Sequence, residues 1–230
     1  MKRRILIISL LAMISLGASA QAKNYRYGIK FGPAFDWASS GSTATENMGV
    51  RLGFNAGLVV DRHFSEQIAF SSGLDFHFMR MKYQFTDLRM VDNFLEEVQL
   101  PVERRVKATE IEVPLKLKAG FHVAESVKAY VEAGCGVAFN LNDRVKDAYD
   151  YYYTSYRDEV YVVRPEQYRL LQASLLFGVG AEYEVNRKLS FFAQAAFNHS
   201  LSNAFVRALE KQTGSILRNN HVGVEVGMLF

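Results

Sequence analysis

The sequence is short of the residues that build disulfides, metal sites and cofactor sites. It has one cysteine, Cys135, so it cannot form an intrachain disulfide. Its five histidines are scattered without the spacing of metal ligands, and its glycines do not precede a helix as in a phosphate-binding loop. From these shortages we expect no metal and no cofactor.

Charge of one sign and long apolar runs are also scarce. The formal net charge is +3, and three of the basic residues lie at positions 2–4. The rest of the chain is close to neutral, which gives no reason to expect nucleic-acid binding. Beyond residue 16 no apolar run has the length needed for a membrane-spanning helix.

The first twenty residues have the pattern of an export signal. Residues 2–4 are basic, residues 5–16 are largely apolar, and residues 18–20 read Ala-Ser-Ala. A basic start, a short apolar stretch and a small-residue site predict a secretory signal peptide over residues 1–20, cleaved near Ala20 or Ala22. An uncleaved inner-membrane anchor is the alternative, and the small-residue site argues against it.

After the signal, the dominant hydrophobic period is two. In the last segment Val222, Val224, Val226, Met228 and Phe230 alternate with polar residues and glycine, and a closing strand that ends on an aromatic residue is typical of outer-membrane barrels. The alternation also occurs over residues 25–37, 50–61, 67–78, 109–121, 127–140, 171–183 and 189–200. We therefore predict an all-β protein, an eight-stranded antiparallel transmembrane β-barrel of OmpX- or OmpA-like size over residues 23–230.

The connections between these strands alternate in length. Short turns are expected at residues 62–66, 122–126 and 186–188, and long polar segments at 38–48, 82–106, 142–167 and 202–218. Short periplasmic turns and long extracellular loops are typical of outer-membrane barrels. We therefore predict a multi-pass protein of the cell outer membrane, in contact with its lipid, with both termini in the periplasm.

The competing interpretation is a soluble barrel of the lipocalin type, whose apolar face points inward. Here the polar face combines many glycines with charges of both signs, which suits a narrow interior and leaves the Val, Leu and Phe face for lipid. By parity, the inward charges are Arg26, Lys30, Asp36, Arg51, Asp75, Glu110, Glu112, Lys116, Lys118, Lys128, Glu132, Glu182 and Glu225.

Charges in such an interior must pair, because an unpaired buried charge is costly. Eight strands leave an interior that side chains fill, so a salt-bridged plug is favoured over a polar conduit. His77 and His221 are expected to be interior hydrogen-bonding residues. Two positions disturb the pattern: Pro114 removes a ladder donor and predicts a bulge or a local break, and Phe192 breaks the alternation of its strand.

The long segments contain the candidate partner-binding residues. Residues 149–159 are rich in tyrosine and charge, and Tyr and Arg are favoured at recognition surfaces. An aromatic belt at the lipid headgroups is the alternative for the tyrosines, and segment 85–106 either extends a hairpin above the membrane or docks on a partner. The candidates are Tyr151, Tyr152, Tyr153, Tyr156, Arg157, Phe94, Arg104 and Arg105.

Catalytic chemistry has one weak candidate, the stretch Asn-His-Ser-Leu-Ser-Asn-Ala at residues 198–204. It resembles the His-x-Ser-Asn motif of lipid A deacylase barrels, in which base and nucleophile share a strand face. Here the interval is one residue longer, so a regular strand places His199 and Ser202 on opposite faces. We predict a non-enzymatic protein with His199 as an interfacial polar residue, and a lipid A-modifying enzyme is the least favoured alternative.

Three motifs resemble the PorT family of Bacteroidota outer-membrane barrels. They are Tyr-Gly-Ile-Lys-Phe-Gly-Pro at residues 27–33, Ile-Glu-Val-Pro-Leu-Lys-Leu-Lys at 111–118 and Ala-Tyr-Val-Glu-Ala-Gly-Cys-Gly at 129–136. In that family a Gly-hydrophobic-Lys-Gly strand, a Glu-Ile/Val-Pro-Leu-Leu-Lys strand and a Tyr-x-x-x-Gly strand recur. The resemblance covers nearly all of the chain after the signal.

That family is tied to type IX protein secretion. The resemblance implies an accessory or assembly role in that machinery, with type IX secretion components as partners and no catalytic residues. It does not imply a channel, because a folded passenger cannot pass through eight strands. A structural or adhesin-like barrel whose loops bind a partner is the alternative.

Overall fold

The computed structural model describes residues 24–40, 45–90, 97–150, 157–162, 169–186, 188–203 and 217–230. Within these ranges all regular secondary structure is β-strand. No helix in these ranges is long and apolar enough to cross a bilayer. The expected signal peptide, residues 1–20, lies outside the described residues, so its assignment stays a prediction.

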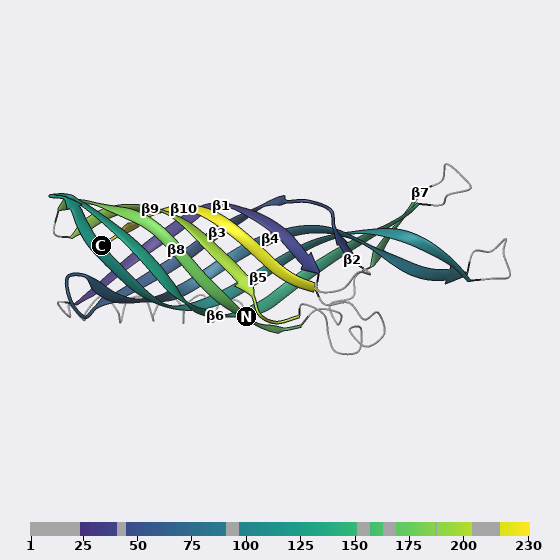
Figure 1. The fold of residues 1–230 in the computed structure, drawn as a ribbon, viewed down its shortest axis with the longest axis horizontal. Coiled ribbons are helices and arrows are strands. Elements are labelled where there is room, and N and C mark those ends of the chain that lie inside the picture. Colours follow the sequence, from purple (N-terminus) through teal and green to yellow (C-terminus); the bar gives the residue numbers. More distant parts are fainter. Residues whose placement is uncertain are drawn as a thin grey trace, which may run out of the picture.

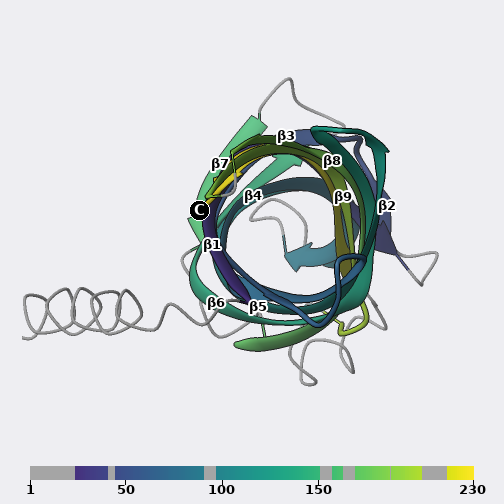
Figure 2. The same ribbon diagram turned by 90° about the vertical axis from the view of Figure 1, so that its left-hand side faces the viewer.

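Eight strands close a barrel, which confirms the predicted fold class. Each strand is antiparallel to the next, and the first pairs with the last, so the ring is complete (Figure 2). Closure leaves no open sheet edge in the wall. The strands are β1 (Tyr25–Ser40), β3 (Arg51–His63), β4 (Ile68–Met90), β5 (Glu97–Ala124), β6 (Val127–Asp150), β8 (Leu171–Asn186), β9 (Leu189–Ser200) and β10 (Leu217–Leu229).

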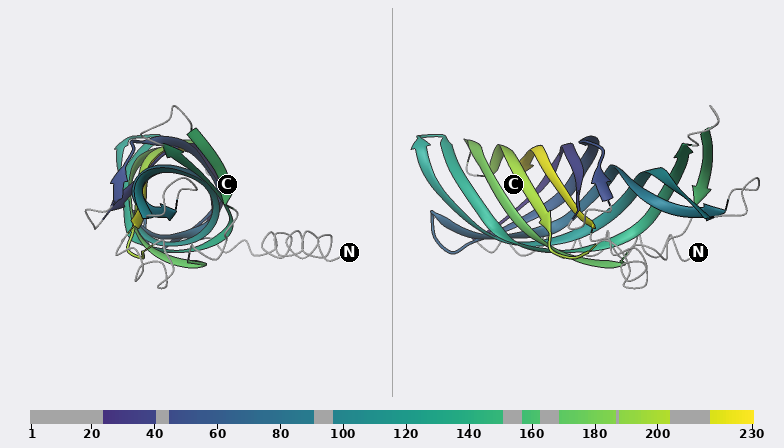
Figure 3. Two further views of the ribbon diagram at one scale, coloured as in Figure 1. Left: turned by 90° about the vertical axis from the view of Figure 1, so that its right-hand side faces the viewer. Right: turned by 45° about the vertical axis from the view of Figure 1, so that its right-hand side comes forward.

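Two short strands lie outside this ring. β2 (Thr45–Asn47) pairs with β4, and β7 (Arg157–Val162) pairs with β6. The tight turns β3–β4, β5–β6 and β8–β9 gather at one end of the barrel, and the long hairpins project from the other (Figures 1 and 3). We refer to these as the turn end and the hairpin end.

The hairpin end corrects the expectation of long loops at residues 82–106 and 142–167. β4 continues to Met90, β5 begins at Glu97, and β6 continues to Asp150. Residues 85–90 and 97–106 therefore extend the hairpin above the barrel, one of the two alternatives, and docking on a partner stays a prediction. The alternation continues here in the opposite sense: Met79, Met81 and Tyr83 are buried in an apolar cluster, whereas Arg80 is exposed. These parts of the strands have no lipid face, so their outer side chains are polar.

The alternation within the barrel wall has the expected orientation. Leu117 and Val131 are 61% and 54% exposed on the outer surface. The intervening polar side chains, such as Lys116 and Glu132, are buried. Apolar side chains therefore face outward and charges face the axis, which is the reverse of a lipocalin-type barrel.

One predicted inward charge, Arg51, is instead exposed. It is the first residue of β3, at the hairpin end, where the wall opens and its side chain reaches solvent. The other predicted inward charges are buried or half-buried.

Pro114 produces a local break without a bulge. The β4–β5 ladder pairs Ser72 with Leu115 and Asp75 with Glu112, and the register is the same on both sides of the gap. Ser72 donates a hydrogen bond through its hydroxyl to the Pro114 carbonyl at 2.8 Å. On its other side Pro114 still pairs with Gly136 of β6.

Phe192 breaks the alternation because its ring points into the barrel. It is buried with Tyr130 and Leu229 in an apolar cluster. Gly227 lies opposite Phe192 in the ladder, and a Cβ at Gly227 would come within 2.5 Å of the Phe192 ring. The glycine thus provides the space that the aromatic side chain needs.

The outward orientation predicts a depth-dependent cost for charge on the lipid face. Leu117→Arg places a cation near the middle of the part of β5 that lies in the barrel wall, and it should lower the free energy of unfolding in bilayers by about 2–4 kcal/mol. Val123→Arg, near the turn end of the same strand, should cost no more than about 1 kcal/mol. Urea titrations in lipid vesicles measure both values, and equal costs for the two variants would contradict this orientation.

Candidate functional site

A buried lysine joins three strands inside the barrel. Lys30 Nζ of β1 lies 2.8 Å from Asp75 Oδ2 of β4 and 3.1 Å from Glu225 Oε2 of β10. β3 runs between β1 and β4, and its residue in this row is Gly57. A Cβ at Gly57 would lie 2.2 Å from Asp75 Oδ1 and 3.1 Å from Lys30 Cε. The glycine therefore allows the lysine to reach across a whole strand to its partner.

A second lysine ties strands together nearer the turn end. Lys118 Nζ of β5 pairs with Asp61 Oδ2 of β3 at 3.1 Å and with Glu182 of β8. It also lies 4.0 Å from the centroid of the Tyr130 ring. Glu182 accepts a further hydrogen bond from Arg26 Nη1 of β1 at 3.1 Å. Each charge in this group thus has a partner on another strand.

Neutral side chains donate further hydrogen bonds to Glu225 and Glu112. Glu225 accepts hydrogen bonds from Asn55 Nδ2 at 3.1 Å and from Gln194 Nε2 at 2.6 Å. Glu112 accepts one from Asn198 Nδ2 at 3.0 Å. The cavities inside this network have volumes of about 10, 20 and 30 Å³, room for single water molecules. The described interior is a filled polar plug, as expected, and not a solute channel.

Apolar residues cover the network at the hairpin end. Met79, Met81 and Tyr83 of β4 pack with Val106 and Ala108 of β5 in a buried cluster. The cluster of Phe192, described above, lies between the two lysine groups: along β9, Ser190 bonds to Arg26 of the Lys118 group, and Gln194 bonds to Glu225 of the Lys30 group. Apolar packing therefore covers the plug at the hairpin end and separates its two groups of ion pairs.

A cluster of Asp36, His77 and His221 sits between the plug and the hairpin end. Asp36 Oδ1 lies 2.9 Å from His77 Nε2, and Asp36 Oδ2 accepts a hydrogen bond from the Arg80 backbone N–H at 2.8 Å. The ring centroids of His77 and His221 are 4.0 Å apart. The expected interior hydrogen bonding is thus confirmed for His77. Within the described residues, His221 packs by its ring and forms no hydrogen bond.

This cluster has the composition of a partial metal site. The possible ligand atoms of Asp36, His77 and His221 lie within 4.8 Å of one another, and an aspartate with two histidines suits a divalent transition metal. The Asp36–His77 hydrogen bond already satisfies both groups, so we interpret the cluster as a tie between β1, β4 and β10. Sequence parity missed it because the contact depends on the pairing of Asp36 with His221 across the closing strands.

The structure does not bring a serine to His199. His199 Nδ1 lies 2.7 Å from Asn220 Oδ1. The Ser200 hydroxyl donates to the Ser202 carbonyl at 3.1 Å, and Ser202 Oγ accepts from the Ala173 N–H at 3.0 Å. Among the described residues His199 therefore has no nucleophile to activate.

Most of the predicted partner-binding residues lie outside the described ranges. Tyr151, Tyr152, Tyr153, Tyr156 and Phe94 are among these. Arg157 begins β7, where it pairs with Asp150 of β6. Their role in binding stays a prediction.

The two remaining candidates, Arg104 and Arg105, lie on opposite faces of β5. The Arg104 guanidinium is buried 4.7 Å from the centroid of the Phe85 ring. Arg105 is exposed, and its Nη2 lies 2.8 Å from Glu103 Oε1. Of these two, Arg105 is the one whose side chain a partner can reach directly.

Comparison with known proteins places the chain in a family. A family model described as "Outer membrane protein beta-barrel domain" matches residues 18–206. The chain belongs to this family. Its members are outer-membrane barrels, which agrees with the closed ring and the outward apolar face. No curated protein matches the chain.

Solved structures similar to this family member are also barrels of the outer membrane. They include Neisserial surface protein A, with 11% identity and a TM-score of 0.43, covering 87% of this chain and 95% of that one. OprG of Pseudomonas aeruginosa has 11% identity and a TM-score of 0.44, covering 90% and 96%. The protease OmpT of Escherichia coli has 10% identity and a TM-score of 0.38, covering 91% and 97%.

The pairing around Lys30 predicts that a variant without this lysine loses much of its stability, and that removing the two stranded carboxylates restores most of it. Lys30→Met leaves Asp75 and Glu225 buried without their cation, so the free energy of unfolding should fall by about 3–5 kcal/mol. The triple variant Lys30→Met, Asp75→Asn, Glu225→Gln removes the stranded charges and should recover most of the loss. Urea unfolding in detergent micelles measures both variants.

The exposed Lys188 in the β8–β9 turn gives the matched control for this experiment. Lys188→Met removes the same charge from a solvated position and should change the free energy of unfolding by less than about 0.5 kcal/mol. A Lys30→Met barrel as stable as the wild type would show that the axial charges are not coupled as described.

The surroundings of His199 predict that the barrel does not modify lipid A. Cells that overproduce the wild-type protein and cells that overproduce His199→Ala should have identical lipid A mass spectra, because no hydroxyl of the described residues contacts the imidazole. Loss of an acyl chain in the wild type alone would overturn this prediction.

Proposed function

We propose that this outer-membrane barrel is a non-enzymatic accessory or assembly factor that acts through protein contacts at its hairpin end. The observation that supports this most directly is the combination of a filled interior with projecting strands. Because the plug leaves no passage, the barrel itself serves as an anchor. The hairpins β4–β5 and β6–β7 are then the parts that a partner can reach.

The orientation belongs to the same proposal. We place the turn end and both termini in the periplasm and the hairpin end outside the cell. Short periplasmic turns with longer external hairpins are the rule for such barrels, and an export signal over residues 1–20 would deliver the chain to the periplasm.

The finer proposal is that the partner belongs to the type IX protein secretion machinery. Its support is the resemblance of residues 27–33, 111–118 and 129–136 to the PorT family. The barrel would assist or assemble that machinery without conducting its cargo. The second candidate function is an adhesin-like barrel, which the exposed Arg105 on the β4–β5 hairpin favours.

Shortened hairpins test the proposed contacts. In one variant a two-residue turn replaces residues 84–103 and joins Tyr83 to Arg104, which are paired in the ladder. In the other, a turn replaces residues 147–160 and joins Lys146 to Tyr161, which are also paired. Both variants keep the barrel wall. Capture from native outer membranes should recover type IX components with the wild type and lose them with at least one variant.

The controls separate the two candidate functions. Heat-modifiable migration in gels shows that each variant is a folded barrel. A deletion strain should fail to export type IX cargo. Normal export from that strain, together with loss of surface adhesion, would replace the secretion role with the adhesin-like one.

A further inference from the structure

Six basic side chains form an ordered array at the base of the long hairpins. In the β4–β5 ladder Arg80 pairs with Lys107, and in the β5–β6 ladder Lys107 pairs with Arg144. The positions two residues further along repeat the arrangement. The two rows, which we call the basic grid, are Arg80–Lys107–Arg144 and Lys82–Arg105–Lys146.

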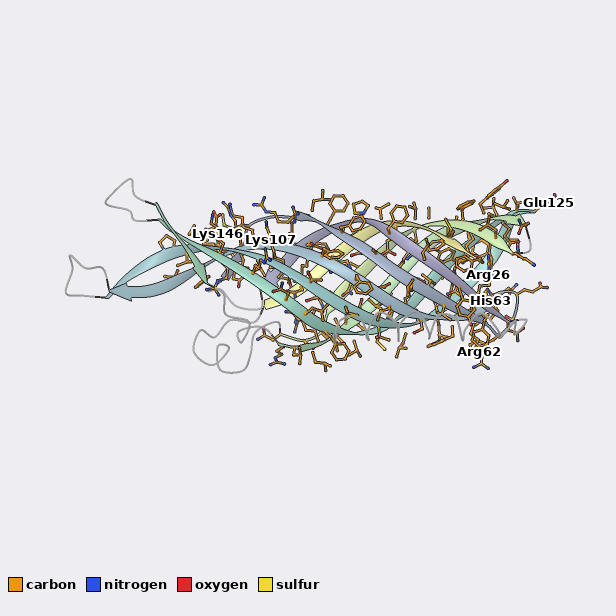
Figure 4. The ribbon with its side chains drawn as sticks, turned by 180° about the vertical axis from the view of Figure 1, so that it is seen from behind. Arg26, Arg62, His63, Lys107, Glu125 and Lys146 are labelled. Atoms are coloured by element: carbon orange, nitrogen blue, oxygen red, sulfur yellow. The ribbon has the colours of Figure 1, made fainter. Side chains whose placement is uncertain are left out.

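The basic grid lies on the outer face of the wall. Arg80, Lys107 and Arg144 are exposed, whereas their neighbours of opposite parity, Met79 and Val106, are buried. Residues two apart in a strand share a face, so both rows point away from the barrel axis. Lys107 and Lys146 lie where the hairpins leave the barrel, far from Arg62 and Glu125 at the turn end (Figure 4).

A bulge in β6 completes the grid. In the β5–β6 ladder Glu110 pairs with Asn140 but Thr109 pairs with Asn142, so Leu141 is an extra residue. Asn140 is buried, whereas Asn142 and Arg144 are exposed. The bulge therefore turns the side chains of Asn142 and Arg144 to the outer surface, whereas Asn140 before it faces the interior. Without it, Arg144 and Lys146 would point inward.

The second row is partly neutralised by a carboxylate. Glu103 Oε2 lies 2.7 Å from Lys82 Nζ, and Glu103 Oε1 lies 2.8 Å from Arg105 Nη2. Burial acts to raise the pKa of the Glu103 carboxyl, but hydrogen bonds from Lys82 and Arg105 hold it below its usual value. Glu103 thus stays charged, and its carboxylate pairs with two of the three cations of this row.

The first row has no such counter-charge. The side chains of Arg80, Lys107 and Arg144 form no ion pair and no hydrogen bond with any residue in the described ranges. Like charges directly opposite one another destabilise a strand pair. These three side chains project from neighbouring strands, and the Cβ atoms of directly opposed residues are only about 5 Å apart. A row of three such cations is best explained by an external anion.

The position of the row identifies the kind of anion. Phe78, two residues before Arg80 on the same face, is 46% exposed, and Leu141, which precedes Arg144 on β6, is 58% exposed. The row therefore begins where the lipid-facing surface ends, at the level of the headgroups. It faces sideways from the wall and not along the axis toward the hairpin tips, so a lipid reaches it more directly than a protein docked on the tips.

We propose that the basic grid binds the phosphate groups of an anionic glycolipid in the outer leaflet of the outer membrane. Arg80 and Arg144 offer planar donor forks that match phosphate oxygens, and Lys107 supplies a compact charge between them. Glu103 holds the second row in place beside the site. The assignment to the outer leaflet rests on the proposed orientation, with the hairpin end outside the cell.

The test uses the full-length barrel in phosphatidylcholine nanodiscs doped with lipid A as the probe. Native mass spectrometry should detect bound bisphosphorylated lipid A and little or no binding of lipid A with the same acyl chains and no phosphate. The variant Lys107→Gln, Arg144→Gln should weaken binding roughly 30-fold, since each cation near a lipid surface contributes about a factor of five. The charge-preserving variant Lys107→Arg, Arg144→Lys should retain binding.

A matched control removes two exposed cations from the same end of the barrel but outside the grid. Arg51→Gln, Arg218→Gln should bind lipid A as the wild type does. Equal loss in the two neutralised variants, or equal binding of both lipids by the wild type, would overturn the proposal.

Two further arms separate other sources of the anion. Displacement of lipid A by millimolar inorganic phosphate would reduce the grid to a site for the free ion. Tighter binding of a polyglutamate peptide than of lipid A, lost in the same neutralised variant, would reassign it to an acidic protein partner. The assay contains no secretion component, so failure of the proposed protein contacts leaves its result unchanged.

Discussion

The structure depends on the pairing of charges around the barrel axis. In a ring of eight strands the interior is too narrow to stay hydrated, so each ionic side chain must find a partner of opposite sign or a set of hydrogen-bond donors. Lys30 and Lys118 do this by reaching carboxylates on strands that are distant in sequence. Glycines such as Gly57 make the reach possible, because a side chain in that row would occupy the space of the carboxylate.

The requirement for charge pairing also explains why the surfaces of the barrel, and not its interior, are free to bind other molecules. A plug of paired charges with apolar packing between and above them gives a rigid wall and no passage, so function moves to the surfaces that the wall presents. The outer face offers an apolar band for lipid and, directly above it, a row of three cations that have no ion pair with the described residues. The hairpins β4–β5 and β6–β7 extend beyond the membrane as regular strands, which hold any contact surface at their tips at a fixed distance from the barrel (Figure 3).

The sequence was sufficient to predict the strands that cross the membrane, since lipid on one side and a crowded axis on the other impose a strict period of two. It was not sufficient for β4 beyond Tyr83 or for β6 beyond Asn140, where neither constraint acts. Side-chain partners depend on the register between strands, so Lys30 could be placed inside but not assigned to Asp75. The bulge at Leu141 reversed the parity of Arg144 and Lys146, and for this reason the basic grid was not visible as a pattern along the chain.

The most direct test of the central claim uses the single native cysteine. Cys135 is exposed on β6, with an outward parity that places it against lipid. A nitroxide attached to Cys135 in a reconstituted barrel should collide frequently with oxygen dissolved in the bilayer and rarely with a water-soluble nickel complex. A thiol that cannot be labelled in the folded barrel, or a label that the nickel complex reaches more readily than oxygen does, would contradict the account.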